Sequence, residues 1–241
     1  MIERDPRAFS RSRLCQHAAG RADPIKIDRG ILTVPFRSGK PVPAEGGLTL
    51  TAKEVETVRY PKECVLKECV EAVIRPLETV DRPLLDAFYK RIPESDRWFM
   101  NYDVKDSAIM DKWFDALDKG SVCSILALCG ADVVGQGSLY LRGFGATSHV
   151  GRFRIVVLPE FRQKRLGTWL LLDLIQLAMD RGLEMLRADL VAGVEDGAIE
   201  AVQKFDFFKF GELKDYVKDI NGNRQDLVIM IKRLHKEWSD Y

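Results

Sequence analysis

From about residue 64 onward, segments with apolar residues at helical spacing alternate with short apolar runs that are typical of strands. Between residues 167 and 181, leucine, isoleucine and alanine side chains fall three and four positions apart, which predicts an amphipathic helix. The runs of apolar and β-branched residues at 149–158 and 185–191 predict a strand on each side of that helix. Strand, helix and strand in this order indicate a mixed α/β fold.

The same patterns predict the remaining elements. Strands are expected over 64–67, 70–75, 122–128, 133–141, 149–158, 185–191, 213–220 and 225–234, and helices over 81–92, 109–117, 167–181 and 196–205. Asp81 is expected to cap the first helix, because a carboxylate accepts the unpaired N–H groups of a helix start. Asn221-Gly222 is expected to form a type I′ hairpin turn between the last two strands.

The first 50 residues differ in character from the rest. Arginine, glycine and proline are common there, and only residues 30–36 resemble a strand, which Pro35 would confine to a sheet edge. We therefore expect residues 1–50 to form a flexible or surface-wrapped extension, and residues 51–241 to form one folded domain.

Composition narrows the classes of function. The chain is 46% hydrophobic and 30% charged, with a formal net charge of +1, so nothing in the overall charge favours binding to nucleic acid or a membrane. Polar residues interrupt the longest apolar helix, and the charged N-terminus does not resemble a secretory signal. A cytoplasmic protein is the expectation.

Cysteine and histidine spacing does not predict a metal site. The five cysteines are scattered, and the three histidines lie far from one another in the sequence. We expect reduced, mostly buried thiols and no metal.

The segment between the strand at 155–158 and the helix at 167 carries the most informative chemistry. Pro159 ends the strand, and a short loop with Arg162, Lys164 and Arg165 leads into the helix. A helix start has unpaired N–H groups and a partial positive charge, which together attract anions. Strand, basic loop and helix start therefore predict a cradle for a pyrophosphate group.

This segment resembles the acyl-CoA-binding signature of the GNAT acyltransferase superfamily, Arg/Gln-x-x-Gly-x-Gly/Ala. Arg162, Gly167 and Thr168 match the signature, whereas Arg165 stands where its first glycine would be. The resemblance covers residues 70–234. Within this range, Val73–Leu77 resembles the opening strand of the family, and Asp132–Ser138 resembles a later strand. It implies the GNAT fold, a central, mostly antiparallel sheet flanked by helices. The segment Ile92–Phe99 resembles members that acetylate protein lysines.

The resemblance also implies an activity, the transfer of an acetyl group from acetyl-CoA to an amine on a protein lysine or a small molecule. In such proteins backbone groups hold the co-substrate. The implied contacts to pantetheine and thioester are Ile155, Val156 and Val157, and those to the pyrophosphate are Arg162, Gln163, Lys164, Arg165, Leu166, Gly167 and Thr168. A homodimer is one assembly that this activity would allow.

The usual catalytic side chains of the family are not found. Arg152 stands at the position of the glutamate base, and Val202 stands at the position of the tyrosine acid. The second position follows from matching Asp206-Phe207 to the family's Gly-Phe pair. Candidate substitutes are Asp189, Glu195, Tyr140 and Tyr216, although ion pairing, helix starts and packing explain these residues equally well. The missing groups leave two alternatives open. One is an acyl-CoA-binding sensor without catalysis, and the other is a structural module without a ligand.

Bulky aromatic side chains also allow two interpretations. Trp98, Phe99, Trp113 and Phe114 could line an acceptor pocket, but their positions in and after helices favour a place in the core.

Overall fold

The computed structural model describes residues 59–100 and 102–234. The extension predicted for residues 1–50, with its edge strand at 30–36, lies outside the described residues. The described elements occur in the order β1 (Lys62–Val65), η1 (Lys67–Cys69), β2 (Glu71–Pro76), η2 (Thr79–Asp81), α2 (Arg82–Arg91), α3 (Glu94–Arg97), α4 (Ser107–Asp118), β3 (Val122–Cys129), β4 (Asp132–Tyr140), β5 (Val150–Val157), η3 (Pro159–Phe161), α5 (Leu166–Asp180), β6 (Met185–Val191), α6 (Asp196–Gln203), β7 (Phe208–Lys218) and β8 (Arg224–Arg233).

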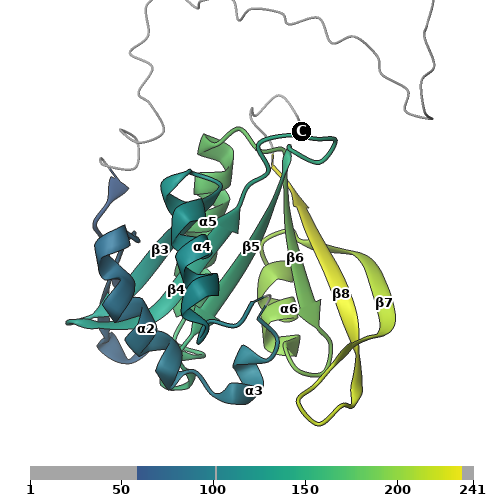
Figure 1. Cartoon of the computed structure of the whole chain (residues 1–241), viewed down its shortest axis with the longest axis horizontal. Helices are drawn as coiled ribbons and strands as arrows, with labels where there is room; N and C mark the ends of the chain where they lie inside the picture. Colours follow the sequence, from purple (N-terminus) through teal and green to yellow (C-terminus); the bar gives the residue numbers. More distant parts are fainter. Residues whose placement is uncertain (1–58, 101, 235–241) are drawn as a thin grey trace, which may run out of the picture. The chain divides into compact units, whose positions relative to one another are not determined.

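The described strands form one eight-stranded sheet in the order β1-β2-β3-β4-β5-β6-β8-β7 (Figure 1). Every neighbouring pair is antiparallel except β5 and β6, which run parallel. This arrangement confirms the expected mixed α/β fold with a mostly antiparallel sheet. The connection from β5 to β6 passes through α5, as parallel neighbours require a crossover.

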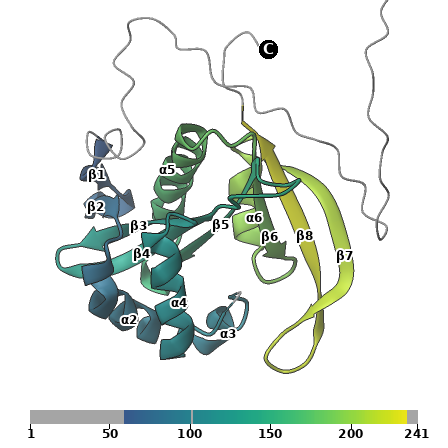
Figure 2. The ribbon, with the colours of Figure 1, turned by 45° about the horizontal axis from the view of Figure 1, so that its top comes forward.

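Helices cover both faces of the sheet (Figures 1 and 2). The hydroxyl of Tyr89 on α2 donates to Gln136 on β4, which places α2 on the face of the even-numbered β4 residues. A Cβ atom on Gly137 would lie 3.1 Å from Leu174 of α5, so α5 packs closely on the opposite face. The loop at the start of α5 is therefore held against the middle of the sheet.

The helix α5 is buried along most of its length, because apolar residues form the side that faces the core. Leu166, Leu170 and Leu174 are less than 2% exposed. The buried carboxylate of Asp173 is paired with Lys62 of β1, with Nζ and Oδ1 2.7 Å apart. No described helix has both the length and the apolar character to cross a membrane.

Two local expectations are wrong. Asp81 lies at the N-cap of α2 but accepts no N–H from that helix. It accepts the Glu78 N–H and pairs with both terminal nitrogens of Arg75, at 2.6 and 2.7 Å. The stronger, charge-assisted partner explains why the capping bond does not form.

The hairpin between β7 and β8 does not contain a type I′ turn. Gly222 has φ +85°, but Asn221 does not adopt the positive φ that a type I′ turn also requires. The Gly222 N–H donates to the Asp219 carbonyl, and the Asp219 N–H donates to the Asn223 carbonyl. The connection is a three-residue loop, in which a β-turn is followed by a left-handed glycine. The Asp219 carboxylate favours it by accepting the N–H groups of Asn221 and Asn223.

Candidate active site

The parallel strands β5 and β6 are paired only at one end. Their register joins Val150, Gly151 and Arg152 to Met185–Arg187 and then stops, whereas β5 remains paired with β4 as far as Val157. Beyond Arg152 the two strands separate (Figures 1 and 2). Because successive residues of a strand direct their N–H and C=O groups alternately to its two sides, part of the backbone of residues 153–157 faces this opening without a partner strand.

The loop that follows β5 presents a row of unused donors. Five successive N–H groups, from Gln163 to Gly167, have no hydrogen-bond acceptor among the described residues. Gln163 and Arg165 both have positive φ, at 59° and 70°. Left-handed residues in such a run turn neighbouring N–H groups toward one concave side, which is the geometry of an anion-binding nest. The start of α5 adds its partial positive charge at the same place.

The basic side chains of this loop differ in their availability. Arg162 is paired with Asp96, and its Nε donates to the Val157 carbonyl at 3.2 Å. Lys164 is paired with Glu68. Only Arg165 of the three is exposed without a carboxylate partner in the part of the chain that the structure describes. The position predicted to need a glycine does have a left-handed backbone, with arginine adopting it.

A cavity of about 910 Å³ lies where β5 and β6 separate, on the sheet face opposite α5. Its walls come from the segment after α3, from β4 to β6 and from the β7–β8 hairpin, and are lined by Trp98, Phe99, Met100, Tyr102, Tyr140, Leu141, Arg142, Val150, Arg152, Phe153, Arg154, Arg187, Asp189, Val191, Leu213, Tyr216, Val217, Lys218 and Leu227. The indole N–H of Trp98 donates to the Lys218 carbonyl at 2.8 Å and so joins the first of these segments to β7.

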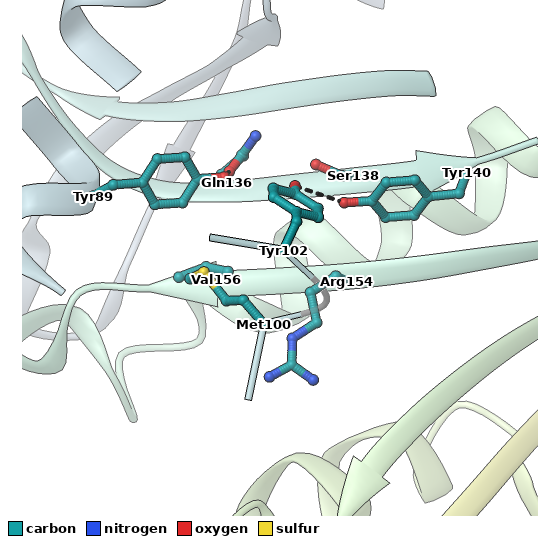
Figure 3. Close-up of a pocket in the computed structure, with 8 residues that line it drawn as sticks. All are labelled: Tyr89, Met100, Tyr102, Gln136, Ser138, Tyr140, Arg154 and Val156. Atoms are coloured by element: carbon teal, nitrogen blue, oxygen red, sulfur yellow. Dashed lines mark hydrogen bonds between the residues drawn. The ribbon is translucent and has the colours of Figure 1, made fainter. Parts of the chain in front are cut away.

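A cluster of hydroxyl groups lies beside this cavity (Figure 3). The hydroxyls of Tyr102 and Tyr140 are 2.9 Å apart. In the same cluster the Tyr89 hydroxyl donates to the Gln136 amide, which in turn donates to the Ser124 hydroxyl. Burial raises the pKa of Tyr102 and of Tyr89 well above the ordinary value. These phenols therefore stay protonated and act as hydrogen-bond donors at neutral pH.

The two acidic candidates are both engaged by arginines. Asp189 lies in the cavity wall, where its carboxylate is paired with Arg152 of β5 and Arg187 of β6. Glu195 precedes α6, pairs with Arg154 at 2.7 Å and accepts the Val191 N–H at 2.9 Å. Guanidinium groups thus occupy the oxygen atoms with which either residue would accept a proton.

The two tyrosine candidates both line the cavity, Tyr140 at the end of β4 and Tyr216 on β7. Tyr140 stands opposite Arg152 in the β4–β5 register, at the point where β5 and β6 separate. Tyr216 is 65% exposed on β7. The structure therefore brings Tyr140, Tyr216 and Asp189 to one cavity and leaves Glu195 outside its lining.

The aromatic residues separate into two groups. Trp113 and Phe114 are buried, as expected, with their rings 5.3 Å apart. Trp98 is 52% exposed and lines the cavity together with the half-buried Phe99, so the expected core position is wrong for both residues. The hydrogen bond to Lys218, a residue remote in sequence, holds the Trp98 indole at the surface.

The family assignment rests on a sequence comparison. The model of the Acetyltransferase (GNAT) family matches residues 87–207, half of the chain, which includes β5, the donor-rich loop and α5. This chain belongs to the GNAT acetyltransferase family. A search of curated proteins found no match.

Solved structures of GNAT acetyltransferases share the fold. An N-acetyltransferase from Staphylococcus aureus Mu50 has 22% identity and a TM-score of 0.57 over 68% of this chain and 99% of its own. A ribosomal-protein-alanine N-acetyltransferase from Brucella melitensis has 25% identity and a TM-score of 0.57 over 67% and 99%. A putative acetyltransferase from Salmonella typhimurium, solved with its cofactor acetyl-CoA, has 18% identity and a TM-score of 0.58 over 69% and 96%.

Within this GNAT chain, two positions that sequence matching assigned have informative surroundings. Asp206 replaces the glycine of the family's Gly-Phe pair and has φ +61°, a conformation that favours glycine. Val202, at the position of the family's tyrosine, is buried and 5% exposed. Among the described residues, no three His, Cys, Asp or Glu side chains come together as a metal site.

Proposed function

We propose that this protein is an N-acetyltransferase that transfers the acetyl group of acetyl-CoA to an amine. The observation that supports this most strongly is the continuity between the open edge of β5 and the nest of free N–H groups at Gln163–Gly167. Together they could bind a long ligand that has an extended arm, able to pair with a strand, and a pyrophosphate at one end.

The chain's own groups would divide the binding of acetyl-CoA between them. The backbone of Ile155, Val156 and Val157 would pair with pantetheine and orient the thioester. The N–H groups of Gln163 to Gly167, with the Thr168 hydroxyl and the Arg165 guanidinium nearby, would hold the pyrophosphate. The ion pairs of Arg162 and Lys164 fix the shape of the loop, because each ties it to another part of the fold.

Tyr140 is the residue that we propose as the proton donor to the leaving thiolate. The amine nitrogen attacks the thioester carbonyl, the C–S bond breaks, and the sulfur takes a proton while the amine releases one to solvent. Tyr140 lines the cavity next to the separation of β5 and β6, and its hydroxyl shares a hydrogen bond of 2.9 Å with that of Tyr102. The carboxylates of Asp189 and Glu195 would position arginines instead of accepting protons.

Calorimetric titration with acetyl-CoA, followed by an assay of thiol release with a panel of amines, tests the proposal. We expect micromolar binding and amine-dependent release of CoA. Binding without release from any amine would instead support the alternative of a sensor that has lost catalysis. No binding up to millimolar acetyl-CoA would refute both and favour a structural module.

The variant Tyr140→Phe tests the assignment of the acid. We expect kcat to fall about 100-fold, the usual contribution of a general acid, with acetyl-CoA affinity unchanged. Tyr216→Phe is the matched control, because Tyr216 lines the same cavity from β7 and is mostly exposed. An equal loss of kcat in both variants would contradict the role of Tyr140.

The location, the acceptor and the assembly of the enzyme are further parts of the proposal. We propose a cytoplasmic enzyme, since Cys64 and Cys129 are thiols in the structure. The acceptor would be a protein lysine or a small amine, without nucleic acid or a membrane as a partner, and a homodimer is the assembly to test first.

A further inference from the structure

The cavity where β5 and β6 separate, beside the strand edge proposed to hold the thioester, has a strong imbalance of charge. Its lining contains five basic side chains and one carboxylate, which are Arg142, Arg152, Arg154, Arg187, Lys218 and Asp189. They come from the loop after β4 and from β5, β6 and β7, so they surround the space on several sides. Residues from the segment after α3, Trp98 to Met100 and Tyr102, complete the wall with apolar and aromatic surface.

Ion pairs neutralise only part of this charge. Asp189 forms ion pairs with both Arg152 and Arg187, and Glu195 pairs with Arg154 from outside the cavity. Arg142 and Lys218 have no carboxylate partner among the described residues. The closest polar contact of the Arg142 side chain is to the Thr147 hydroxyl, at 3.4 Å. The cavity therefore keeps unpaired positive charge on two walls.

One donor inside the basic cluster is also unsatisfied. The Nε of Arg154 is buried and has no hydrogen-bond partner, although the terminal nitrogens of the same guanidinium contact Glu195. A buried donor without an acceptor is unfavourable unless a ligand or water supplies one. This donor is consistent with a site that binds an oxygen-rich anion.

We infer that the acceptor is a small amine that also carries a carboxylate or phosphate group. This inference rests on the proposed function and specifies its substrate class. The planar donors of arginine match the oxygen atoms of both groups. A volume of about 910 Å³ is of the size that encloses a small molecule.

The same charges account for catalysis without the family's glutamate base. Arg152 occupies that base position. The charged groups in the cavity lining are the five cations and Asp189, and the other titratable groups there are the hydroxyls of Tyr102, Tyr140 and Tyr216. Nearby positive charge lowers the pKa of an ammonium group, so a larger fraction of the bound amine is neutral and nucleophilic. The oxyanion of the acceptor holds it in the site against the repulsion of its ammonium. The proton leaves to solvent before attack, and the thiolate takes one as CoA departs.

Matched pairs of acceptors test the inference. β-Alanine is compared with β-alaninamide, and O-phosphoethanolamine with ethanolamine, by thiol release at low salt. We expect kcat/KM to be at least about tenfold higher for the anionic member, the effect of one charged hydrogen bond. The members without the anionic group, which are cations at neutral pH, have the less basic amines and would react faster in a site without anion recognition. Equal or faster acetylation of these members would overturn the inference. The two pairs also distinguish carboxylate from phosphate.

Two charge-removing variants locate the anion site. Arg142→Gln and Lys218→Gln leave no carboxylate unpaired, because neither side chain is in an ion pair with a described residue. We expect each to lower about tenfold the ratio of kcat/KM for the anionic acceptor to kcat/KM for its partner without the anionic group. Arg233→Gln and Lys112→Gln are the matched controls, exposed and outside the cavity lining. Losses of equal size in the controls would show that the anionic group does not bind at Arg142 and Lys218.

A binding measurement separates this inference from the proposed function. The protein is titrated with N-acetyl-β-alanine and with N-acetyl-β-alaninamide, which need no turnover. Tighter binding of the anion, weakened by salt, supports the anion site even if no amine releases CoA, in which case the catalytic proposal alone fails. Equal binding of the two overturns the anionic acceptor, while thiol release with amines that lack the anionic group would still uphold acetyl transfer.

Discussion

At the scale of single residues, Arg165 combines two opposing effects. It extends the positive charge of the nest, but its backbone has φ +70° and ψ +5°, where a side chain is strained. A left-handed conformation is unfavourable by about 1–2 kcal/mol for residues other than glycine. The chain therefore has an arginine at a position where the backbone favours the glycine of the family signature.

We predict that Arg165→Gly raises the free energy of unfolding by about 0.5–1 kcal/mol, the relieved strain less the entropy of glycine in the unfolded chain. Urea denaturation measures this change. Arg165→Ala is the control, because it removes the same charge and keeps the strained backbone. Equal stability of the two variants would show that the strain is absent. Calorimetry on both variants then reports what the guanidinium contributes to acetyl-CoA binding.

Asp81 supplies a second prediction, because it is 5% exposed and contacts Arg75 with both oxygens. The Arg75 guanidinium holds the pKa of the Asp81 carboxyl below its usual range. A lowered pKa in the folded state means that this stabilisation is present above the unfolded value, about 3.9, and is lost as pH falls through the folded value. Asp81→Asn should lower the free energy of unfolding by about 2 kcal/mol at pH 7.

The difference between wild type and Asp81→Asn should shrink as the pH falls below about 4. Urea denaturation at several pH values tests this trend. Asp115→Asn, on the exposed side of α4, should change stability little at any pH. A difference that stays constant down to low pH would mean that the ion pair is not its source.

At the scale of elements, the junction of β5 and β6 depends on Gly151. A Cβ atom there would lie 2.5 Å from Leu183 and 3.0 Å from Leu139, so even alanine forces these side chains to move. We predict that Gly151→Ala costs about 1–3 kcal/mol of stability, as overpacking of a core does. It should also weaken acetyl-CoA binding, because Gly151 belongs to the short paired segment from which the opening begins.

Gly211→Ala is the matched control, since a Cβ atom there meets nothing within 4 Å on the edge strand β7. Thermal unfolding and calorimetry on the two variants separate steric crowding from the general effect of replacing a strand glycine. A Gly151→Ala protein as stable as Gly211→Ala would show that the packing at this junction is looser than the structure indicates.

Most elements could be predicted from the sequence, because burial imposes its period on the residues. The strand β6 has the predicted bounds, and α5 differs by one residue at each end. The strand β7 begins at Phe208, not at Leu213, since both its faces are largely exposed and its apolar residues do not alternate clearly. The four-residue helix α3 is too short to show a helical period.

The loop proposed to bind the pyrophosphate could be recognised because its residues are consecutive. The cavity beside β5 and β6 could not, since it joins Trp98, Tyr140, Arg187 and Lys218 from four separate parts of the chain. Periodicity assigned Trp98 to the core because nothing in the sequence shows its bond to the Lys218 carbonyl. Ion pairs such as that of Arg152 with Asp189 depend on strand order in the same way.

At the scale of the whole molecule, the sheet consists of two parts joined by the three-residue parallel register of β5 and β6. A ligand that fills the opening would bind along that junction, so we predict a large thermal stabilisation by acetyl-CoA. At 100 times its dissociation constant, the gain is about 2.7 kcal/mol, which raises Tm by roughly 5–10 °C. A thermal shift assay measures it. Arg142→Gln should shift equally, since its side chain is proposed to contact the acceptor only. No shift at saturating acetyl-CoA would contradict the cradle.

The opening between β5 and β6 also matters for how the protein avoids self-association. Exposed sheet edges are sites where other chains can add a strand, and the outer edges here are blunted by four-residue β1 and by the irregular, lysine-bearing β7. The free segment of β5 is a third edge, but β6 and β4 lie on either side of it within the same sheet. A folded neighbour cannot reach it, whereas a slender, flexible arm can. The fold thus keeps main-chain hydrogen bonding available to a ligand without exposing it to aggregation.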